Sequence, residues 1–280
     1  RLPVPSIQAQ EDEEAPVAYL YGSAPDAPDA ELQAIVDDVV GDLRGTWGVV
    51  VKKLDTGQYA SFNPDKQQVS ASLYKMWVLS ELFRQAKVGN LELNGYATVT
   101  GADTWYDASV GDQRLYAGDE LTLRRLAYLM VTVSDNSASA ALVRILGPNN
   151  INRFMQQNGL ENSVLDWSGI GDNLTTPRDV ARVMEKIATL RMVDAEASKQ
   201  MLDIMLDQQV NNILAPGLPE GTPFAHKHGN LDALLLVCET RLFHRIGGER
   251  KHATLLLRGG VALGIHLNPL ASVEVLTIRH

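Results

Sequence analysis

The chain has 280 residues, 45% of them hydrophobic, and a formal net charge of −9. This is enough apolar material for a substantial core, in one large domain or two small ones. The acidic balance argues against nucleic acid or an anionic membrane surface as the main partner. The single cysteine, Cys238, excludes an intramolecular disulfide and a metal site built from cysteines. No apolar run approaches the roughly 20 residues that span a bilayer, so no membrane span is expected.

Residues 1–29 are expected to lie outside the folded domain. The stretch LPVPSIQAQEDEEAP resembles the end of a secretory signal, with Ala9 as a cleavage position. From Gln10 onward the sequence is acidic and rich in Ala, Pro and Asp, which is typical of a disordered lead. The sequence therefore predicts an exported protein that is secreted, periplasmic or held at the cell surface.

Helices and strands are expected in a definite order from Ala30 onward. Apolar residues at helical spacing, such as Leu32, Val36 and Val40, predict a first helix. Two extended runs joined by Asp55-Thr56-Gly57 then predict a β-hairpin over 46–63. Helical patterns follow over 73–84, 121–133, 136–146, 150–160 and 176–190, and strand-like runs return after about residue 224.

This order predicts an α+β fold, an α/β/α sandwich. Its antiparallel sheet would be built from both chain ends, residues 30–70 and 191–280. An all-helical subdomain, residues 71–190, would be inserted between them.

One helix opens with a serine and a lysine three residues apart, Ser72 and Lys75. Positions i and i+3 share a helix face, so the two side chains would point into the same space. A desolvated, neutral lysine can take the proton of a serine hydroxyl and make it a nucleophile. The alternative is a helix-capping serine followed by a solvated lysine.

Two further polar motifs interrupt apolar segments. Ser134-Asp135-Asn136 separates two helical patterns, and capping of the second helix would explain it equally well. Lys227-His228-Gly229 lies on a late strand, and a lysine two residues before a glycine is common. The specific signal is the conjunction of Ser-x-x-Lys, Ser-Asp-Asn and Lys-x-Gly in this order.

The three motifs together resemble those of the serine penicillin-recognising enzymes, and among them the class A β-lactamase-like hydrolases, over roughly residues 30–237. The resemblance implies an acyl-enzyme formed with a β-lactam or related amide, and no cofactor. It implies a nucleophile at Ser72, a proton acceptor at Lys75 and a proton relay at Ser134. The implied substrate-binding residues are Asn136, Lys227, His228, Gly229 and Asn230, with Tyr106 or Trp105 at the rim. The backbone N–H groups of Ser72 and Asn230 would form the oxyanion hole.

The loop before Thr175-Thr176-Pro177 departs from the class A pattern. It is shorter and lacks the glutamate that activates the deacylating water in that family. Asp166 and Asp172 are its only carboxylates, and they are either replacement deacylation bases or ordinary turn residues. Two alternatives to a hydrolase therefore stay open: a D,D-peptidase-like penicillin-binding protein with slow deacylation, and a non-catalytic sensor of β-lactam or peptidoglycan.

His228 stands where the resembling enzymes have threonine or serine, which implies a changed substrate preference. Together with His226 it could contact a metal from one face of a strand, but no third ligand is apparent and no metal is expected. The expected partner is a small β-lactam or a peptidoglycan-like substrate, bound by a monomer.

The pattern changes again from Cys238 onward. The resemblance implies a long C-terminal helix, whereas Pro269 and β-branched residues such as Val273 and Val275 disfavour one. Two explanations are open: a divergent ending that still supplies two strands, and a change of reading frame near Cys238.

Overall fold

The computed structural model describes residues 23–41, 46–104, 114–210, 224–231, 234–241, 253–257, 261–265 and 272–279, and beyond residue 229 it describes the backbone alone. The expected signal segment up to residue 22 lies outside the described residues. So do Trp105 and Tyr106, the two candidates for the aromatic residue at the rim.

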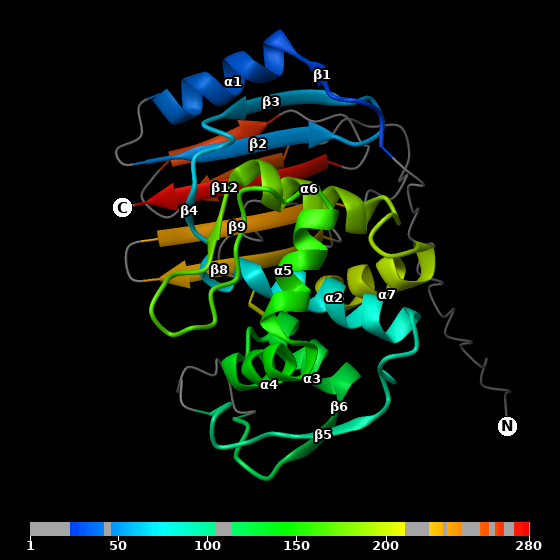
Figure 1. Cartoon of the computed structure of the whole chain (residues 1–280). Coiled ribbons are helices and arrows are strands. Elements are labelled where there is room, and N and C mark those ends of the chain that lie inside the picture. The colour runs from blue at the N-terminus through cyan, green and yellow to red at the C-terminus, as the bar shows by residue number, and fades with distance from the viewer. Residues whose placement is uncertain are drawn as a thin grey trace, which may run out of the picture.

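Strands from both ends of the chain form one six-stranded sheet (Figure 1). The early strands are β1 (Ala27–Pro28), β2 (Gly48–Lys53) and β3 (Gln58–Phe62), and the late ones are β8 (Phe224–Leu231), β9 (Leu234–Arg241) and β12 (Ser272–Arg279). Their order is β1-β3-β2-β12-β9-β8, and every neighbouring pair is antiparallel except β1 with β3. The expected mixed fold, with a sheet built from both chain ends, is confirmed. Strand β8 is left at an edge of the sheet.

The first helix and the hairpin form as the sequence predicts. Helix α1 (Ala30–Gly41) buries Leu32, Val36 and Val40 and contacts β3. Gly57 closes the turn between β2 and β3 at φ +76°, where a Cβ atom would lie 1.9 Å from the carbonyl oxygen of Pro25. That contact arises because residues 24–28, assigned above to the disordered lead, run beside the hairpin. The Ala27 amide donates to the Gly57 carbonyl over 2.7 Å, so these backbone groups are paired.

Most of the middle of the chain is helical. The helices are α2 (Lys75–Lys87), α3 (Leu123–Thr132), α4 (Asn136–Leu146), α5 (Pro148–Gln157), α6 (Pro177–Ala188) and α7 (Ala195–Leu206). Helix α6 begins as expected, with the Thr176 hydroxyl accepting from the Asp179 amide and Pro177 in the first turn. Helix α7 is an additional helix, within residues 191–280, which the sequence predicts to belong to the sheet subdomain.

Short elements complete the described fold. The 3₁₀ turn η1 (Ala71–Tyr74) leads into α2. Two-stranded pairs form between β4 (Gln68–Val69) and β7 (Leu174–Thr175), between β5 (Tyr96–Thr98) and β6 (Glu120–Thr122), and between β10 (Ala253–Leu257) and β11 (Val261–Ile265). Within the described ranges, no helix combines the length and the apolar character needed to cross a membrane.

Helix α2 runs through the centre of the helical part and is buried on nearly every side. Met76, Trp77, Val78 and Leu79 are each at most 1% exposed, and α2 contacts α4, α5 and α7. The burial includes polar side chains of the helix, such as Ser80 and Glu81, whereas Lys87 at its end is exposed. Lys75, at the first position of α2, is fully buried.

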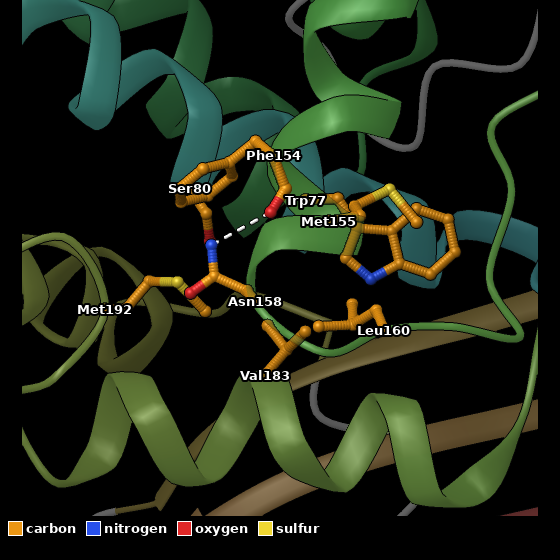
Figure 2. A pocket seen from close by; sticks show the side chains of 8 residues that line it. All are labelled: Trp77, Ser80, Phe154, Met155, Asn158, Leu160, Val183 and Met192. Atoms are coloured by element: carbon orange, nitrogen blue, oxygen red, sulfur yellow. Dashed lines mark hydrogen bonds between the residues drawn. The ribbon is translucent and has the colours of Figure 1, made fainter.

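A small cavity lies where α2, α5 and α6 meet (Figure 2). Its volume is about 10 Å³, about enough for one water molecule. The residues that line it are Trp77, Ser80, Phe154, Met155, Asn158, Leu160, Val183 and Met192. This cavity is too small for an organic substrate and contains none of the candidate site residues.

Candidate active site

Ser72 lies where η1 meets the edge strand β8. It is half-buried, while the next two residues, Leu73 and Tyr74, are buried and fix the turn in the core. A Cβ atom at Gly229 of β8 would lie 2.9 Å from the Cβ of Ala71 and 3.0 Å from the backbone nitrogen of Ser72. Only glycine lets β8 approach the serine this closely. Ala71 itself has φ +44°, in the left-handed region that side chains other than glycine rarely adopt.

Lys75 is fully buried and points toward the break between α3 and α4. Its Nζ donates to the Ser134 carbonyl over 2.6 Å, to the Ser134 Oγ over 3.1 Å and to the Asn136 Oδ1 over 2.7 Å. Burial lowers the pKa of Lys75 to about 7, and the negative charge of Asp135 opposes this shift. A substantial neutral fraction is therefore present at neutral pH, as a general base requires.

Ser134 is presented by the break between α3 and α4. Its φ of +57° turns the chain out of the helix, so that both its carbonyl and its hydroxyl face Lys75. The next residue, Asp135, caps α4 by accepting from the Ala138 amide over 2.7 Å. Burial raises the pKa of the Asp135 carboxyl. Capping of the second helix is thus confirmed for Asp135, while the chemical role of Ser134 and Asn136 stays a prediction.

Lys227 reaches the same hydroxyl from the sheet. Its Nζ donates to the Ser134 Oγ over 3.0 Å and to the His228 carbonyl over 2.7 Å, and the side chain is fully buried. Burial, together with the positive charge of Lys75, lowers the pKa of Lys227 well below its ordinary value. Both lone pairs of the Ser134 oxygen accept from lysines, so its own proton must point toward a third partner.

The two histidines of β8 are buried and held neutral. Burial lowers the pKa of His226 to about 4, and burial with the charge of Lys227 lowers the pKa of His228 to about 2. His226 stacks on Phe224 at 4.4 Å and bonds the Val210 carbonyl through Nε2 over 3.2 Å. Among the described residues, no group of three His, Cys, Asp or Glu side chains could hold a metal ion.

Asn230, the last of the expected binding residues, is placed only by its backbone. It pairs with Leu235 in the β8–β9 ladder, one residue beyond Gly229. Asn136 is placed in full, at the start of α4, with its side-chain oxygen bonded to Lys75. The structure therefore brings Ser134, Asn136 and Lys227 together around Lys75, with Ser72 one turn before that lysine.

The loop that carries Asp166 and Asp172 reaches the site through other residues. The Asp166 carboxylate accepts from the Ser168 amide over 2.8 Å, and hydrogen bonds from Ser168 and Gly171 lower its pKa. Asp172 is exposed. Among the described residues, no hydrogen bond joins either carboxylate to η1.

Asn173 and Trp167 link this loop to the nucleophile, and sequence reasoning missed both. The Asn173 carbonyl accepts from the Ser70 amide over 2.6 Å, while its side-chain oxygen accepts from the Asp166 amide over 2.8 Å. The Trp167 ring lies 6.1 Å from that of Tyr74, in η1. The contact follows from the pairing of β4 with β7. Each of these strands has two residues, which is too short to give a recognisable pattern in the sequence.

Known proteins share this fold. PBP-A resembles the chain with a TM-score of 0.76 and 24% sequence identity, covering 92% of this chain and 90% of that one. A β-lactamase from Sphaerobacter thermophilus gives a TM-score of 0.70 at 22% identity, covering 88% and 86%. In sequence, β-lactamase CARB-4 from Pseudomonas aeruginosa is 24% identical over 217 residues, which are 72% of this chain and 75% of that protein.

These likenesses define the fold as that of the serine penicillin-recognising proteins. The model of the Beta-lactamase enzyme family matches residues 29–241, and the chain belongs to that family. The matched region ends three residues after Cys238, where the sequence pattern changes.

Proposed function

We propose that the protein is a serine hydrolase that reacts with β-lactams through an acyl-enzyme at Ser72. The observation that carries this proposal is the position of the Ser134 hydroxyl between Lys75 and Lys227, at 3.1 and 3.0 Å. Binding alone needs no activated nucleophile, whereas two buried lysines around one hydroxyl are suited to moving protons.

The proposed step conserves one proton throughout. Neutral Lys75 takes the hydroxyl proton of Ser72 while the Ser72 Oγ attacks the lactam carbonyl and forms a bond to its carbon. When the ring C–N bond breaks, Ser134 gives its proton to the leaving nitrogen. Ser134 then recovers a proton from Lys75, which returns to its neutral form. The 3.1 Å contact between Lys75 and Ser134 supports this route.

The edge of the sheet would bind the substrate. An extended amide can pair with β8, the edge strand of the sheet that the structure describes, which passes directly beside the Ser72 backbone. The N–H groups of Ser72 and Asn230 would stabilise the oxyanion, and Lys227 and His228 would contact the substrate carboxylate. Asn136 would bind the substrate amide side chain. Because the expected substrates lie outside the cytoplasm, we also place the protein there, as a monomer.

Slow release of the acyl group is the second part of the proposal. The Asp166 carboxylate is bonded to amides of its own loop. Without a base to activate water, an ester at Ser72 would persist, as in a D,D-peptidase-like penicillin-binding protein. PBP-A has a similar fold, and one mutant of it has been solved as an acyl-enzyme complex with penicillin G.

The test is an intact-mass time course of the purified protein with benzylpenicillin. We expect an adduct with the mass of the whole antibiotic, absent in Ser72→Ala. Ser70→Ala is the matched control, since among the described residues the Ser70 hydroxyl donates to the neighbouring Ala71 carbonyl and forms no hydrogen bond with a site residue. An adduct lasting for hours would support the slow enzyme, and hydrolysed antibiotic without adduct would support a β-lactamase. Neither adduct nor hydrolysis would refute the proposal.

A further inference from the structure

The segment after α7 joins the two halves of the site through one buried side chain. Gln208 is 4% exposed, and its Nε2 donates to the Val131 carbonyl over 2.9 Å and to the His226 carbonyl over 3.4 Å. Its side-chain oxygen accepts from the Val210 amide over 3.2 Å. The carboxamide therefore uses both ends, and its burial keeps water from replacing it.

The two carbonyls that Gln208 binds belong to different parts of the fold. Val131 lies near the end of α3, three residues before Ser134, and His226 comes directly before Lys227 on β8. A second bond from the same segment, from the Gln209 amide to the Thr132 carbonyl over 2.9 Å, holds it against α3.

His226 connects the same segment to strand β8. His226 bonds the Val210 carbonyl over 3.2 Å, while Val210 bonds Gln208 through its amide. Residues 208–210 thus contact α3 on one side and β8 on the other.

We propose that Gln208 is a positioning residue for the Ser134 proton relay, because it sets the separation between the end of α3 and β8. This inference rests on the proposed function for its kinetic consequence. Ser134 can accept from both lysines only if a helix and a strand far apart in the chain stay in register. Small displacements of a reacting group are costly, since misplacement by about 1 Å can lower a rate by about 100-fold.

By the same proposal, the contacts of Gln208 also exclude water from Lys75, Ser134 and Lys227. Lys75 and Lys227 are fully buried, and burial holds their pKa values below the ordinary range. A gap between α3 and β8 would admit water, and the pKa of Lys75 would rise.

The test compares three single variants in the full chain. Gln208→Met keeps the side-chain volume but removes both polar ends, and Gln208→Glu keeps the length but removes the N–H donors. Gln209→Ala is the matched control, because Gln209 is the adjacent residue of the same type and is exposed. Thermal unfolding shows which variants are folded.

Two readouts are measured on the folded variants. The first is the maximal rate of Ser72 acylation by benzylpenicillin, with the half-saturating concentration measured alongside. We expect the rate to fall about 10- to 100-fold in both Gln208 variants, with little change in half-saturation. The second is the titration of Lys75 by ¹³C NMR of labelled lysine, where we expect the pKa to rise above its wild-type value. The Gln209→Ala variant should match the wild type in both.

The inference is wrong if Gln208→Met acylates Ser72 at the wild-type rate and its Lys75 has the wild-type pKa. It is also wrong if Gln209→Ala lowers the acylation rate as much as the Gln208 variants do. If neither Gln208 variant folds, the residue serves folding rather than positioning. If the wild type forms no Ser72 adduct, the proposed function fails, while the lysine titration still decides the role of Gln208.

Discussion

Lys75 and Lys227 donate to one and the same atom, the Oγ of Ser134, over 3.1 and 3.0 Å. One comes from the first turn of a helix and the other from an edge strand, and both are fully buried. Burial is the main cause of the lowered pKa of both lysines, and the positive charge of Lys75 adds to it for Lys227. These two contacts underlie the predictions below.

Acylation should depend on pH through Lys75. Because its pKa is about 7, the acylation rate should rise as pH increases from 5 to 8, with a midpoint near 7. Lys75→Ala should lower the rate by about 10²- to 10⁴-fold, as expected for loss of a general base. Lys66→Ala, at an exposed lysine, should not change it. Stopped-flow or quenched mass spectrometry would measure the rate, and a profile flat across pH 7 would contradict the assignment.

Stability should also respond to this lysine. Its pKa is lower in the folded chain, about 7, than its ordinary value of 10.5 in the unfolded one. Between these values the unfolded chain binds more protons, so the free energy of unfolding should rise with pH. From pH 7 to 9 the contribution of Lys75 is about 2 kcal/mol. Urea unfolding should show this rise in the wild type and a smaller one in Lys75→Met. Equal rises in the two proteins would exclude a contribution of Lys75 to the pH dependence of stability.

Gly229→Ala should separate β8 from the nucleophile. The new Cβ would meet the Ala71 Cβ at 2.9 Å and the Ser72 nitrogen at 3.0 Å, so the strand or η1 must move. We expect a loss of about 1 to 3 kcal/mol in the free energy of unfolding, as for other overpacked sites. Acylation should slow by about 100-fold because the site loses its register. Gly41→Ala is the control, since nothing lies within 4 Å of its added Cβ.

His228 should act as a neutral group. Its pKa is lowered to about 2, so the imidazole carries no charge at any working pH. In His228→Ala, the half-saturating concentration of a β-lactam carboxylate should rise about 3- to 10-fold, the value of one neutral hydrogen bond. That ratio should stay constant from pH 5 to 8. A ratio that grows toward pH 5 would reveal an imidazolium instead.

The two loop carboxylates should contribute little to deacylation. Since Asp166 is bonded to its own loop and Asp172 is exposed, Asp166→Asn and Asp172→Asn should change the lifetime of the penicillin adduct by less than about twofold. Intact-mass measurements after removal of free antibiotic give this lifetime. A tenfold longer adduct in either variant would identify that residue as a deacylation base.

Local patterns in the sequence were sufficient for most elements of the fold. The apolar spacing of Leu32, Val36 and Val40 predicted α1, and Asp55-Thr56-Gly57 predicted the hairpin turn. Thr176 and Pro177 marked the start of α6. These signals are readable because helix periodicity, turn geometry and capping each depend on residues close together in the chain.

The sequence by itself also determined which residues are candidates for chemistry, through the order of three short motifs. Only the tertiary structure decided how they meet. The contacts of Lys75 and Lys227 with Ser134, the closeness of Gly229 to Ser72 and the link through Gln208 all join segments far apart in the chain. Burial of the lysines, and with it their lowered pKa, arises from the packing of many residues around α2 and β8. No local pattern encodes it, because desolvation is a property of the assembled core.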